Sequence, residues 1–185
     1  MSGMKIVRLE DISAIKPFDC GDSDLNEFLL KDAALYQQQF LASTYIIEDD
    51  DRTIAFYSLL NDKISKSNIP QNLWRKVRKE IPHSKHMGSY PAVKIGRLGV
   101  SLSQKGNRIG SQILEGIRIT LITNRQYSAC RFLTVDAYKE AVPFYEKNGF
   151  IPLLNQPTEE PTVPMYLDLK KYAMNIPPFS VMLSR

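Results

Sequence analysis

Cysteine and histidine are scarce in this chain of 185 residues, which contains two of each. Cys20 and Cys130 are too few for a disulfide framework of the kind that small secreted domains need, so we expect a reduced, cytoplasmic protein. The two histidines, His83 and His86, lie in one short segment. A Ser-His-Asp triad is therefore not expected, and no metal site is predicted, because the pair lacks companion ligands.

Long apolar runs are also missing. No stretch approaches the roughly 20 residues that a membrane-spanning helix needs, and the first residues, MSGMKIVRLE, contain no apolar signal core. Hydrophobic residues make up 43% of the chain and charged residues 24%, which indicates a globular protein. We assign residues 1–173 to one domain and 174–185 to a C-terminal tail. The net charge of +4 is compatible with an anionic cofactor or with nucleic acid and selects neither.

The most informative stretch is residues 95–111, IGRLGVSLSQKGNRIGS. An apolar strand ends near Val100, a turn containing Gly106 and Gly110 follows, and apolar residues then recur at helical spacing. The first backbone N–H groups of a helix have no partner within it and, together with the helix dipole, bind anions such as phosphate. The stretch therefore predicts an anion site at a helix start. It is neither a Walker loop, which needs Gly-Lys-Ser/Thr, nor a Rossmann fingerprint.

The segment KGNRIGSQIL, residues 105–114, resembles motif A of the GNAT family of N-acetyltransferases, (Gln/Arg)-x-x-Gly-x-(Gly/Ala). Lys105 stands at the first position, Arg108 replaces the usual middle glycine, and Gly110 matches the last position. Further on, AVPFYEKNGF, residues 141–150, resembles motif B of the same family. The resemblance implies an α/β fold with a mixed, mostly antiparallel sheet of about six or seven strands, flanked by about four helices.

The N-terminal half resembles one branch of that family. FDCGDSDLNEFLLKDA, STYII and AFYSL are similar to the branch that includes toxins paired with ribbon-helix-helix antitoxins. Asp22, Ser23 and Asp24 are N-cap candidates for a helix, and Asp24 with Glu27 suggests a capping box. The elements expected along the chain are strands at 4–9, 44–48, 53–60, 131–135, 150–154 and 164–169 and helices at 24–39, 70–81, 109–121 and 138–147.

The resemblance also implies a site for acetyl-CoA. The strand would offer main-chain groups to the pantetheine arm, and the loop and helix start would surround the pyrophosphate. The residues expected to bind acetyl-CoA are Leu98, Gly99, Val100, Lys105, Gly106, Asn107, Arg108, Ile109, Gly110 and Ser111. Arg108 could add a charge contact to phosphate, or crowd the loop if its φ is positive. Tyr138 also departs from the family, which often has Asn there.

Tyr145 falls at the position of the family's tyrosine, which makes it the candidate general acid that protonates the leaving thiolate. The alternative is a packing aromatic beside Phe144. The residues do not identify a general base. Glu48, Asp62 and Glu80 are candidates that the sequence does not rank.

A basic helix is expected between Pro70 and Glu80. Its charged side carries Arg75, Lys76, Arg78 and Lys79, and Trp74 lies beside them in the sequence. This side is either a solvated surface or a contact for a phosphate backbone.

The resemblance implies acetyl transfer from acetyl-CoA to a primary amine, and three interpretations remain open. The acceptor is a small molecule or protein, which the modest net charge slightly favours, or it is the amino group of an aminoacyl-tRNA. In the third interpretation the chain is a non-catalytic acyl-CoA-binding module, against which Tyr145 argues. A homodimer and an antitoxin are the protein partners to consider.

Overall fold

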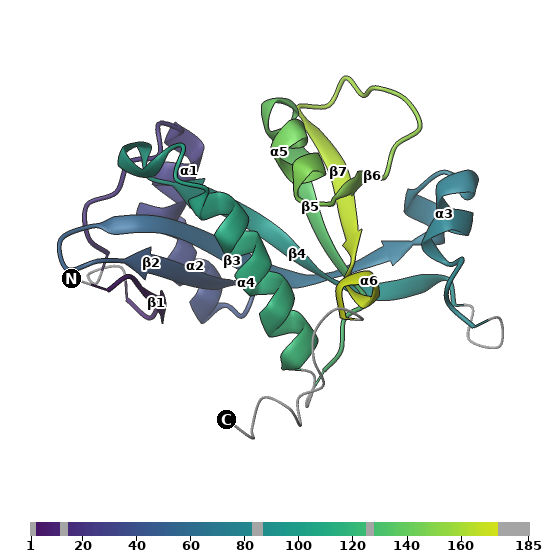
Figure 1. Cartoon of the computed structure of the whole chain (residues 1–185), viewed down its shortest axis with the longest axis horizontal. Coiled ribbons are helices and arrows are strands. Elements are labelled where there is room, and N and C mark those ends of the chain that lie inside the picture. The colour runs from purple at the N-terminus through teal and green to yellow at the C-terminus, as the bar shows by residue number, and fades with distance from the viewer. Residues whose placement is uncertain (1–2, 12–14, 83–86, 125–127, 174–185) are drawn as a thin grey trace. The chain divides into compact units, whose positions relative to one another are not determined.

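The computed structural model describes residues 3–11, 15–82, 87–124 and 128–173. His83, His86 and the tail lie outside these residues. The described strands are β1 (Lys5–Arg8), β2 (Ser43–Glu48), β3 (Thr53–Ser65), β4 (Ser89–Val100), β5 (Phe132–Tyr138), β6 (Ile151–Pro152) and β7 (Thr162–Asp168). The α-helices are α1 (Ser23–Glu27), α2 (Ala33–Gln38), α3 (Gln71–Val77), α4 (Ile109–Thr123), α5 (Val142–Lys147) and α6 (Leu169–Ala173) (Figure 1).

The seven strands form one sheet in the order β1-β2-β3-β4-β5-β7-β6. The antiparallel pairs are β1–β2, β2–β3, β5–β7 and β6–β7. The predicted fold class, a mixed and mostly antiparallel sheet with flanking helices, is confirmed. Among the described residues, no helix combines the length and the apolar composition needed to cross a membrane.

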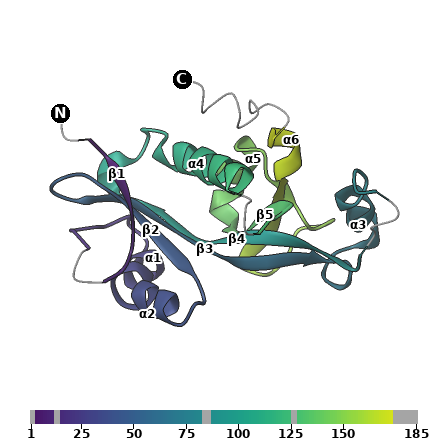
Figure 2. The ribbon, with the colours of Figure 1, turned by 90° about the horizontal axis from the view of Figure 1, so that it is seen from below.

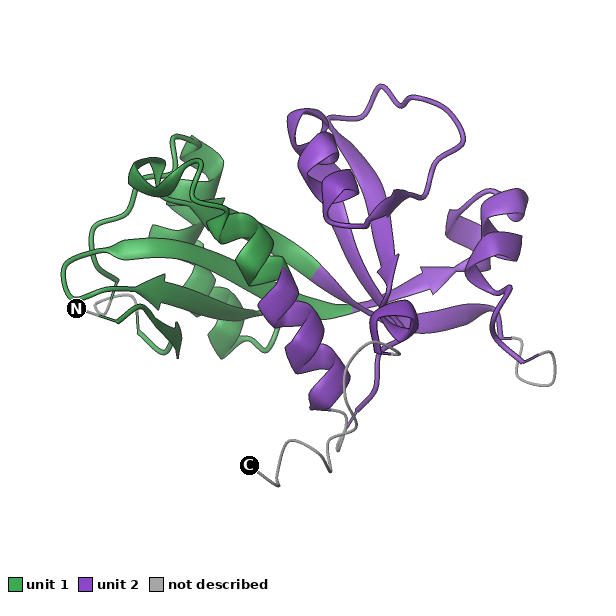
Figure 3. Ribbon diagram, in the orientation of Figure 1, with its two compact units in different colours: residues 1–61, 95–114 green, residues 62–94, 115–185 purple. Residues whose placement is uncertain are grey.

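The chain divides into two compact units (Figure 3). Unit 1 contains residues 1–61 and 95–114, and unit 2 contains residues 62–94 and 115–185. The single domain expected for residues 1–173 stays a prediction.

In unit 1, the helices α1 and α2 cover one face of the strands (Figure 2). Phe28, Leu29 and Ala33 from this helical segment pack against Ile46 of β2 and Phe56 of β3. Burial of these side chains supplies the main stabilising free energy, because each large apolar group removed from water contributes about 1.5–3 kcal/mol.

The helix over residues 23–38 differs in two ways from its prediction. Its N-cap is Asp22, whose Oδ1 accepts a hydrogen bond from the Leu25 backbone N–H at 3.0 Å. The capping box expected from Asp24 is therefore wrong, since Asp24 already lies within the helix. The helix is also interrupted by one π-helical stretch, Phe28–Asp32, so its apolar residues do not follow a uniform helical period.

In unit 2, an aromatic cluster forms the core. Trp74 of α3 stacks on Tyr90 of β4 at 5.2 Å between ring centroids, and Phe132 and Tyr166 extend the cluster across β5 and β7. α3 ends at Val77, earlier than the predicted residue 81. Residues 78–81 continue as hydrogen-bonded turns, in which the Ile81 N–H donates to the Arg78 carbonyl at 3.0 Å. The helix predicted at 138–147 is likewise shorter, because β5 extends to Tyr138.

Candidate active site

The strand, loop and helix predicted at residues 95–111 are present in unit 1. β4 ends at Val100, and the Ser101 N–H then donates to the Ile54 carbonyl of β3 at 2.9 Å. Gly99 is required for packing, because a Cβ there would lie 2.6 Å from the Phe56 ring. This end of β4 lacks a bulky side chain at Gly99, so its backbone can approach an extended ligand closely.

The loop reverses direction with two left-handed residues. Gly106 has φ +86° and Arg108 has φ +59°. The Asn107 side chain donates to Gln104 Oε1 at 3.0 Å, which fixes the turn between them. α4 then begins at Ile109, and the Gln112 N–H bonds to the Arg108 carbonyl at 3.1 Å. Gly110 and Ser111 therefore lie in the first helical turn, where N–H groups have no partner within the helix.

The backbone conformation of Arg108 shows what its departure from the family motif costs. A left-handed backbone costs a non-glycine residue about 1–2 kcal/mol, which explains why glycine is usual at that position. The Arg108 side chain is exposed, as are those of Lys105 and Asn107. Two cations next to a helix N-terminus match a pyrophosphate in charge and in hydrogen-bonding character. The residues present thus fit the phosphate part of acetyl-CoA.

Residues 19–26 of unit 1 form a second segment that contacts this loop. The sequence analysis did not predict these contacts. The Leu102 N–H donates to the Asp19 carbonyl at 2.9 Å. The Asp19 carboxylate accepts hydrogen bonds from the Gly21 N–H and the Asn26 side chain, both at 2.8 Å. These bonds and the nearby Lys105 lower the pKa of Asp19. Hydrogen bonds between residues 19 and 102 could not be read from the local pattern, because they depend on tertiary structure.

Arg97 is another residue that the sequence did not single out. It lies directly before Leu98 on β4, with its guanidinium 5.3 Å from the centroid of the Phe28 ring. Its Nε lies 3.5 Å from Asp24 Oδ2. Arg97 therefore joins β4 to the π-helical stretch of the N-terminal helix.

Tyr145 is a buried residue of α5 in unit 2, with 6% of its surface exposed. Phe144 and Phe150 contact its ring edge-on, at centroid distances of 5.1 and 5.3 Å. Burial raises the pKa of Tyr145 above its usual value, so the hydroxyl stays protonated at neutral pH. A protonated hydroxyl is what a proton donor requires, and the aromatic contacts equally suit a packing role.

α5 ends at Lys147, as predicted, and a tight turn follows it. The Asn148 side chain donates to the Phe144 carbonyl at 2.8 Å, and Gly149 has φ +88°. The Phe150 N–H closes the turn on the Tyr145 carbonyl at 3.0 Å. These bonds fix the helix end that carries Tyr145. Tyr138 lies at the end of β5, with its side chain 39% exposed.

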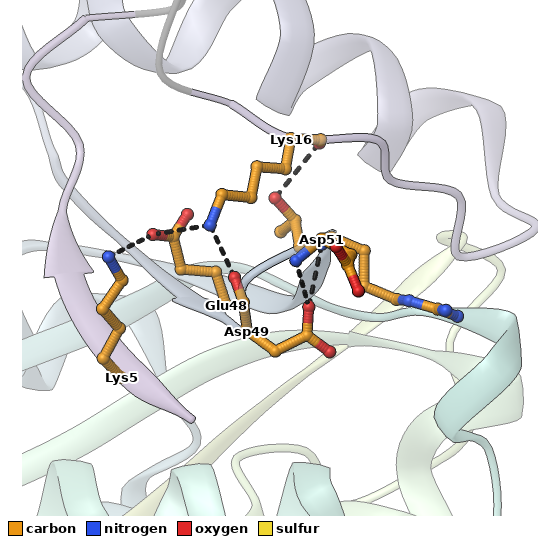
Figure 4. A network of polar contacts seen from close by, with 7 residues as sticks. Lys5, Lys16, Glu48, Asp49 and Asp51 are labelled. Carbon is orange, nitrogen blue, oxygen red and sulfur yellow. Dashed lines mark hydrogen bonds and ion pairs between the residues drawn. The ribbon is translucent and has the colours of Figure 1, made fainter. Parts of the chain in front are cut away.

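Glu48, one candidate base, is held in a network of cations (Figure 4). Lys5 Nζ and Lys16 Nζ lie 3.0 and 3.3 Å from the same carboxylate oxygen, and Lys16 also donates to the Asp49 carbonyl at 2.5 Å. Burial alone would raise the pKa of Glu48, but the two lysines outweigh it and lower the pKa. A carboxylate so stabilised is a poor base, and it ties β1 to β2 instead.

The other two candidate bases belong to unit 2. Glu80 is exposed and lies 3.8 Å from Arg131 Nη2, while Arg131 makes its stronger, bidentate pair with Asp168 at 2.7 Å. Asp62 is half-buried and accepts a hydrogen bond from Thr134 Oγ1 at 2.6 Å.

Both cysteines are free thiols. Cys20 is buried, and its thiol donates a hydrogen bond to Asn26 Oδ1 at 3.2 Å between S and O. Burial raises the pKa of both thiols. A raised pKa disfavours the reactive thiolate, which suits small packing residues.

The charged side of α3 faces solvent as expected. Leu73, Trp74 and Val77 are buried, whereas Arg75, Lys76 and Lys79 are exposed and Arg78 is half-buried. Within the described residues no group of three or more His, Cys, Asp and Glu side chains could bind a metal ion.

Comparison with known proteins finds relatives of the expected family. Residues 80–169 match a family model described as an acetyltransferase (GNAT) domain. A tRNA-acetylating toxin of Mycobacterium tuberculosis (strain ATCC 25618 / H37Rv) is 24% identical over 163 residues, which cover 88% of this chain and 89% of the toxin.

Solved structures share the fold. The toxin AtaT complexed with acetyl-methionyl-tRNAfMet matches with a TM-score of 0.74 at 21% identity, over 94% of this chain and 99% of AtaT. A tyrosine-to-phenylalanine variant of AtaT bound to the C-terminus of the antitoxin AtaR matches with a TM-score of 0.71 at 20% identity, over 95% and 99% of the two chains. GNAT enzymes use acetyl-CoA, in agreement with the co-substrate expected from motif A. Residues 80–169 therefore match a GNAT acetyltransferase domain, in agreement with the N-acetyltransferase activity expected from motifs A and B.

Proposed function

We propose that this protein acetylates the amino group of an aminoacyl-tRNA. The observation that carries the proposal is the relative from Mycobacterium tuberculosis, a tRNA-acetylating toxin that matches along nearly the whole of both chains. The sequence alone slightly favoured a small-molecule or protein acceptor, and the comparisons add no support to that choice. A cytoplasmic location belongs to the same proposal, since charged tRNA is found there.

The basic surface of α3 and of the turns directly after it is the proposed tRNA contact. Trp74 and Val77 anchor the helix on the aromatic cluster of unit 2, so the cations on it and directly after it project from a fixed element. Fixed cations bind a phosphate backbone and release counterions, which makes such binding fall steeply with salt. The residues proposed for this contact are Arg75, Lys76, Arg78 and Lys79.

The proposed acetyl-CoA site is the end of β4 with the loop and helix start that follow it. The backbone of Leu98, Gly99 and Val100 would bind the pantetheine arm. Around the pyrophosphate would lie Lys105, Gly106, Asn107, Arg108, Ile109, Gly110 and Ser111. The thioester supplies the activated acetyl group, and the protein's part is to orient it.

Tyr145 is the proposed general acid. Its hydroxyl is kept protonated by burial and can supply the proton that the leaving thiolate needs. For partners, the match to a toxin bound to its antitoxin supports a ribbon-helix-helix antitoxin as a binding partner. A homodimer stays a prediction.

Incubation with acetyl-CoA labelled in the acetyl group tests the function. The acceptors are charged tRNAs, the same tRNAs after deacylation, a panel of small amines and a panel of proteins. We expect label on the amino acid of charged tRNA and none on the deacylated control. Label on small amines or proteins but not on charged tRNA would refute the proposal.

A further inference from the structure

Four polar side chains form a stripe across one face of the sheet in unit 2. Ile64, Ala92 and Phe132 belong to one core cluster and so mark one face of β3, β4 and β5. Side chains two residues away along a strand lie on the same face. The polar stripe that follows the cluster on these strands is Asp62, Lys94, Thr134 and Asp136.

The two carboxylates of the stripe have different partners. Asp136 Oδ2 pairs with Lys94 Nζ at 2.7 Å, so its charge is compensated. Asp62 Oδ2 accepts the hydroxyl of Thr134 at 2.6 Å, and within the described residues no cation pairs with it. The Thr134 hydroxyl orients the Asp62 carboxylate. Because a hydroxyl is neutral, it does not compensate the negative charge of that carboxylate.

A buried hydroxyl on this face has no hydrogen-bond partner among the described residues. Tyr90 lies on β4 on the same face as Ala92, has 3% of its surface exposed, and its hydroxyl has no hydrogen-bond partner among the described residues. A buried hydroxyl without a partner is uncommon, because its desolvation is not compensated. The face therefore carries a half-buried carboxylate without a paired cation, next to a core in which the Tyr90 hydroxyl has no partner.

The carboxylates of the other two candidate bases are paired with cations within the chain. Glu48 contacts two lysines, and Glu80 lies beside Arg131. Asp62 is the candidate with an unmatched charge in a half-buried setting. An ammonium is the group that such a carboxylate binds most strongly, since it supplies both the opposite charge and the hydrogen-bond donors.

We propose that Asp62 binds the ammonium of the acceptor and takes its proton, with Thr134 as the positioning residue. The proposal rests on the proposed transfer of acetyl to an amine. One N–H proton passes to the Asp62 carboxylate, which leaves a neutral amine. The nitrogen lone pair forms the N–C bond to the thioester carbonyl and the C–S bond breaks. The thiolate takes a proton from the proposed acid Tyr145, the nitrogen returns its second proton to that tyrosine, and Asp62 releases the first to water.

Asp62→Asn is the main test, because it keeps the size and removes the charge. We expect kcat/KM for the charged tRNA at pH 6.5 to fall by about 10²–10⁴, the range for a positioned acid or base. At pH 8.5 the loss should shrink by about tenfold or more, since an α-amino group with a pKa of about 7.7–8.0 is then mostly neutral. Among the described residues, this face also carries the charged or titratable groups Lys94, Asp136, Tyr90, Tyr166 and Asp168. Arg131 pairs with Asp168, and α3 contributes the non-titratable Trp74 and Val77.

Two variants of Thr134 separate positioning from folding. Thr134→Val removes the hydroxyl at nearly constant volume and should lower kcat/KM about tenfold. Thr134→Ser keeps the hydroxyl and should restore most of that activity. Asp136→Asn is the matched control, because its charge already has a cation in the chain, and it should stay within about threefold of wild type. Acetyl-CoA affinity and thermal unfolding are measured for every variant.

The outcomes distinguish this inference from the function on which it rests. If wild type acetylates no amine in the panel, the proposed function fails and this assignment with it. If wild type is active and Asp62→Asn matches it at pH 6.5, Asp62 is not the base. A loss that is the same at pH 6.5 and 8.5 would assign Asp62 a structural role. If Asp62→Asn does not fold, equal activity of Thr134→Val and Thr134→Ser overturns the proposal.

Discussion

The loop of unit 1 and the polar stripe of unit 2 differ in whether backbone or side chains define them. The loop acts through its backbone, in that Gly106, Arg108 and the first turn of α4 give the main chain a particular shape. The stripe acts through side chains from β3, β4 and β5 that hydrogen-bond or pair in space. Backbone shape suits a cofactor common to a family, whereas side chains can differ between proteins with different acceptors.

The largest expected effect is that of Tyr145→Phe, which tests the role of a single side-chain hydroxyl in turnover. Tyr145→Phe removes one hydroxyl and should lower kcat by about 10²–10⁴ while acetyl-CoA affinity is unchanged. Because burial raises the pKa of Tyr145, wild-type activity should not fall from ionisation of this group as pH rises to its usual value of 10.0. Steady-state rates and calorimetry check both points. Tyr57→Phe on β3 is the control, and equal rates for the two variants would assign Tyr145 to packing.

Gly110→Val tests whether the backbone at the start of α4 binds acetyl-CoA. A branched side chain in the first turn of α4 should weaken acetyl-CoA binding about 100-fold or more, because it obstructs the N–H groups that face the pyrophosphate. Gly116→Val in the same helix is the matched control, since a Cβ at Gly116 meets nothing within 4 Å. Unchanged affinity in Gly110→Val by calorimetry would place the cofactor elsewhere.

Glu48→Gln separates a structural carboxylate from the proposed base. Its pKa is lowered in the folded chain, so its contribution to stability is fully present above the unfolded pKa and is lost as pH falls through the lowered value. We expect about 1–3 kcal/mol lower stability at pH 7, a difference that closes in acid, and unchanged kcat. Urea denaturation at several pH values measures the difference in the free energy of unfolding between wild type and variant. A large loss of kcat in a folded Glu48→Gln would return Glu48 to the candidate bases.

Arg108→Gly has the smallest expected effect. Relief of the left-handed backbone should raise stability by about 1 kcal/mol, while loss of the cation should weaken acetyl-CoA binding several-fold. Phe40→Gly is the control, because Phe40 has φ +58° and is 96% exposed outside the loop. It should raise stability similarly and leave acetyl-CoA affinity unchanged. If Arg108→Gly binds acetyl-CoA as wild type does, the guanidinium makes no phosphate contact.

The sequence predicted the parts that depend on neighbouring residues. Gly106 and Gly110 before an apolar helical pattern identified the loop, and the helix predicted at 138–147 ends where α5 does, at Lys147. The pair of Asp62 and Thr134 was not predicted, because the two residues are 72 positions apart and meet only when the strands pair. The N-cap is Asp22, one of the three adjacent polar candidates, and the sequence did not rank them because all three residue types suit that position.

The most direct test of the account measures two affinities on two variants. Calorimetry gives acetyl-CoA affinity and filter binding at two salt concentrations gives tRNA affinity, for Gly110→Val and for a variant with Arg75, Arg78 and Lys79 changed to Glu. We predict that the first loses acetyl-CoA and keeps tRNA, and that the second loses salt-sensitive tRNA binding and keeps acetyl-CoA. A control with Lys139, Lys170 and Lys171 changed to Glu should retain both. Absence of tRNA binding by wild type at low salt, or loss of both ligands in either variant, would contradict the account.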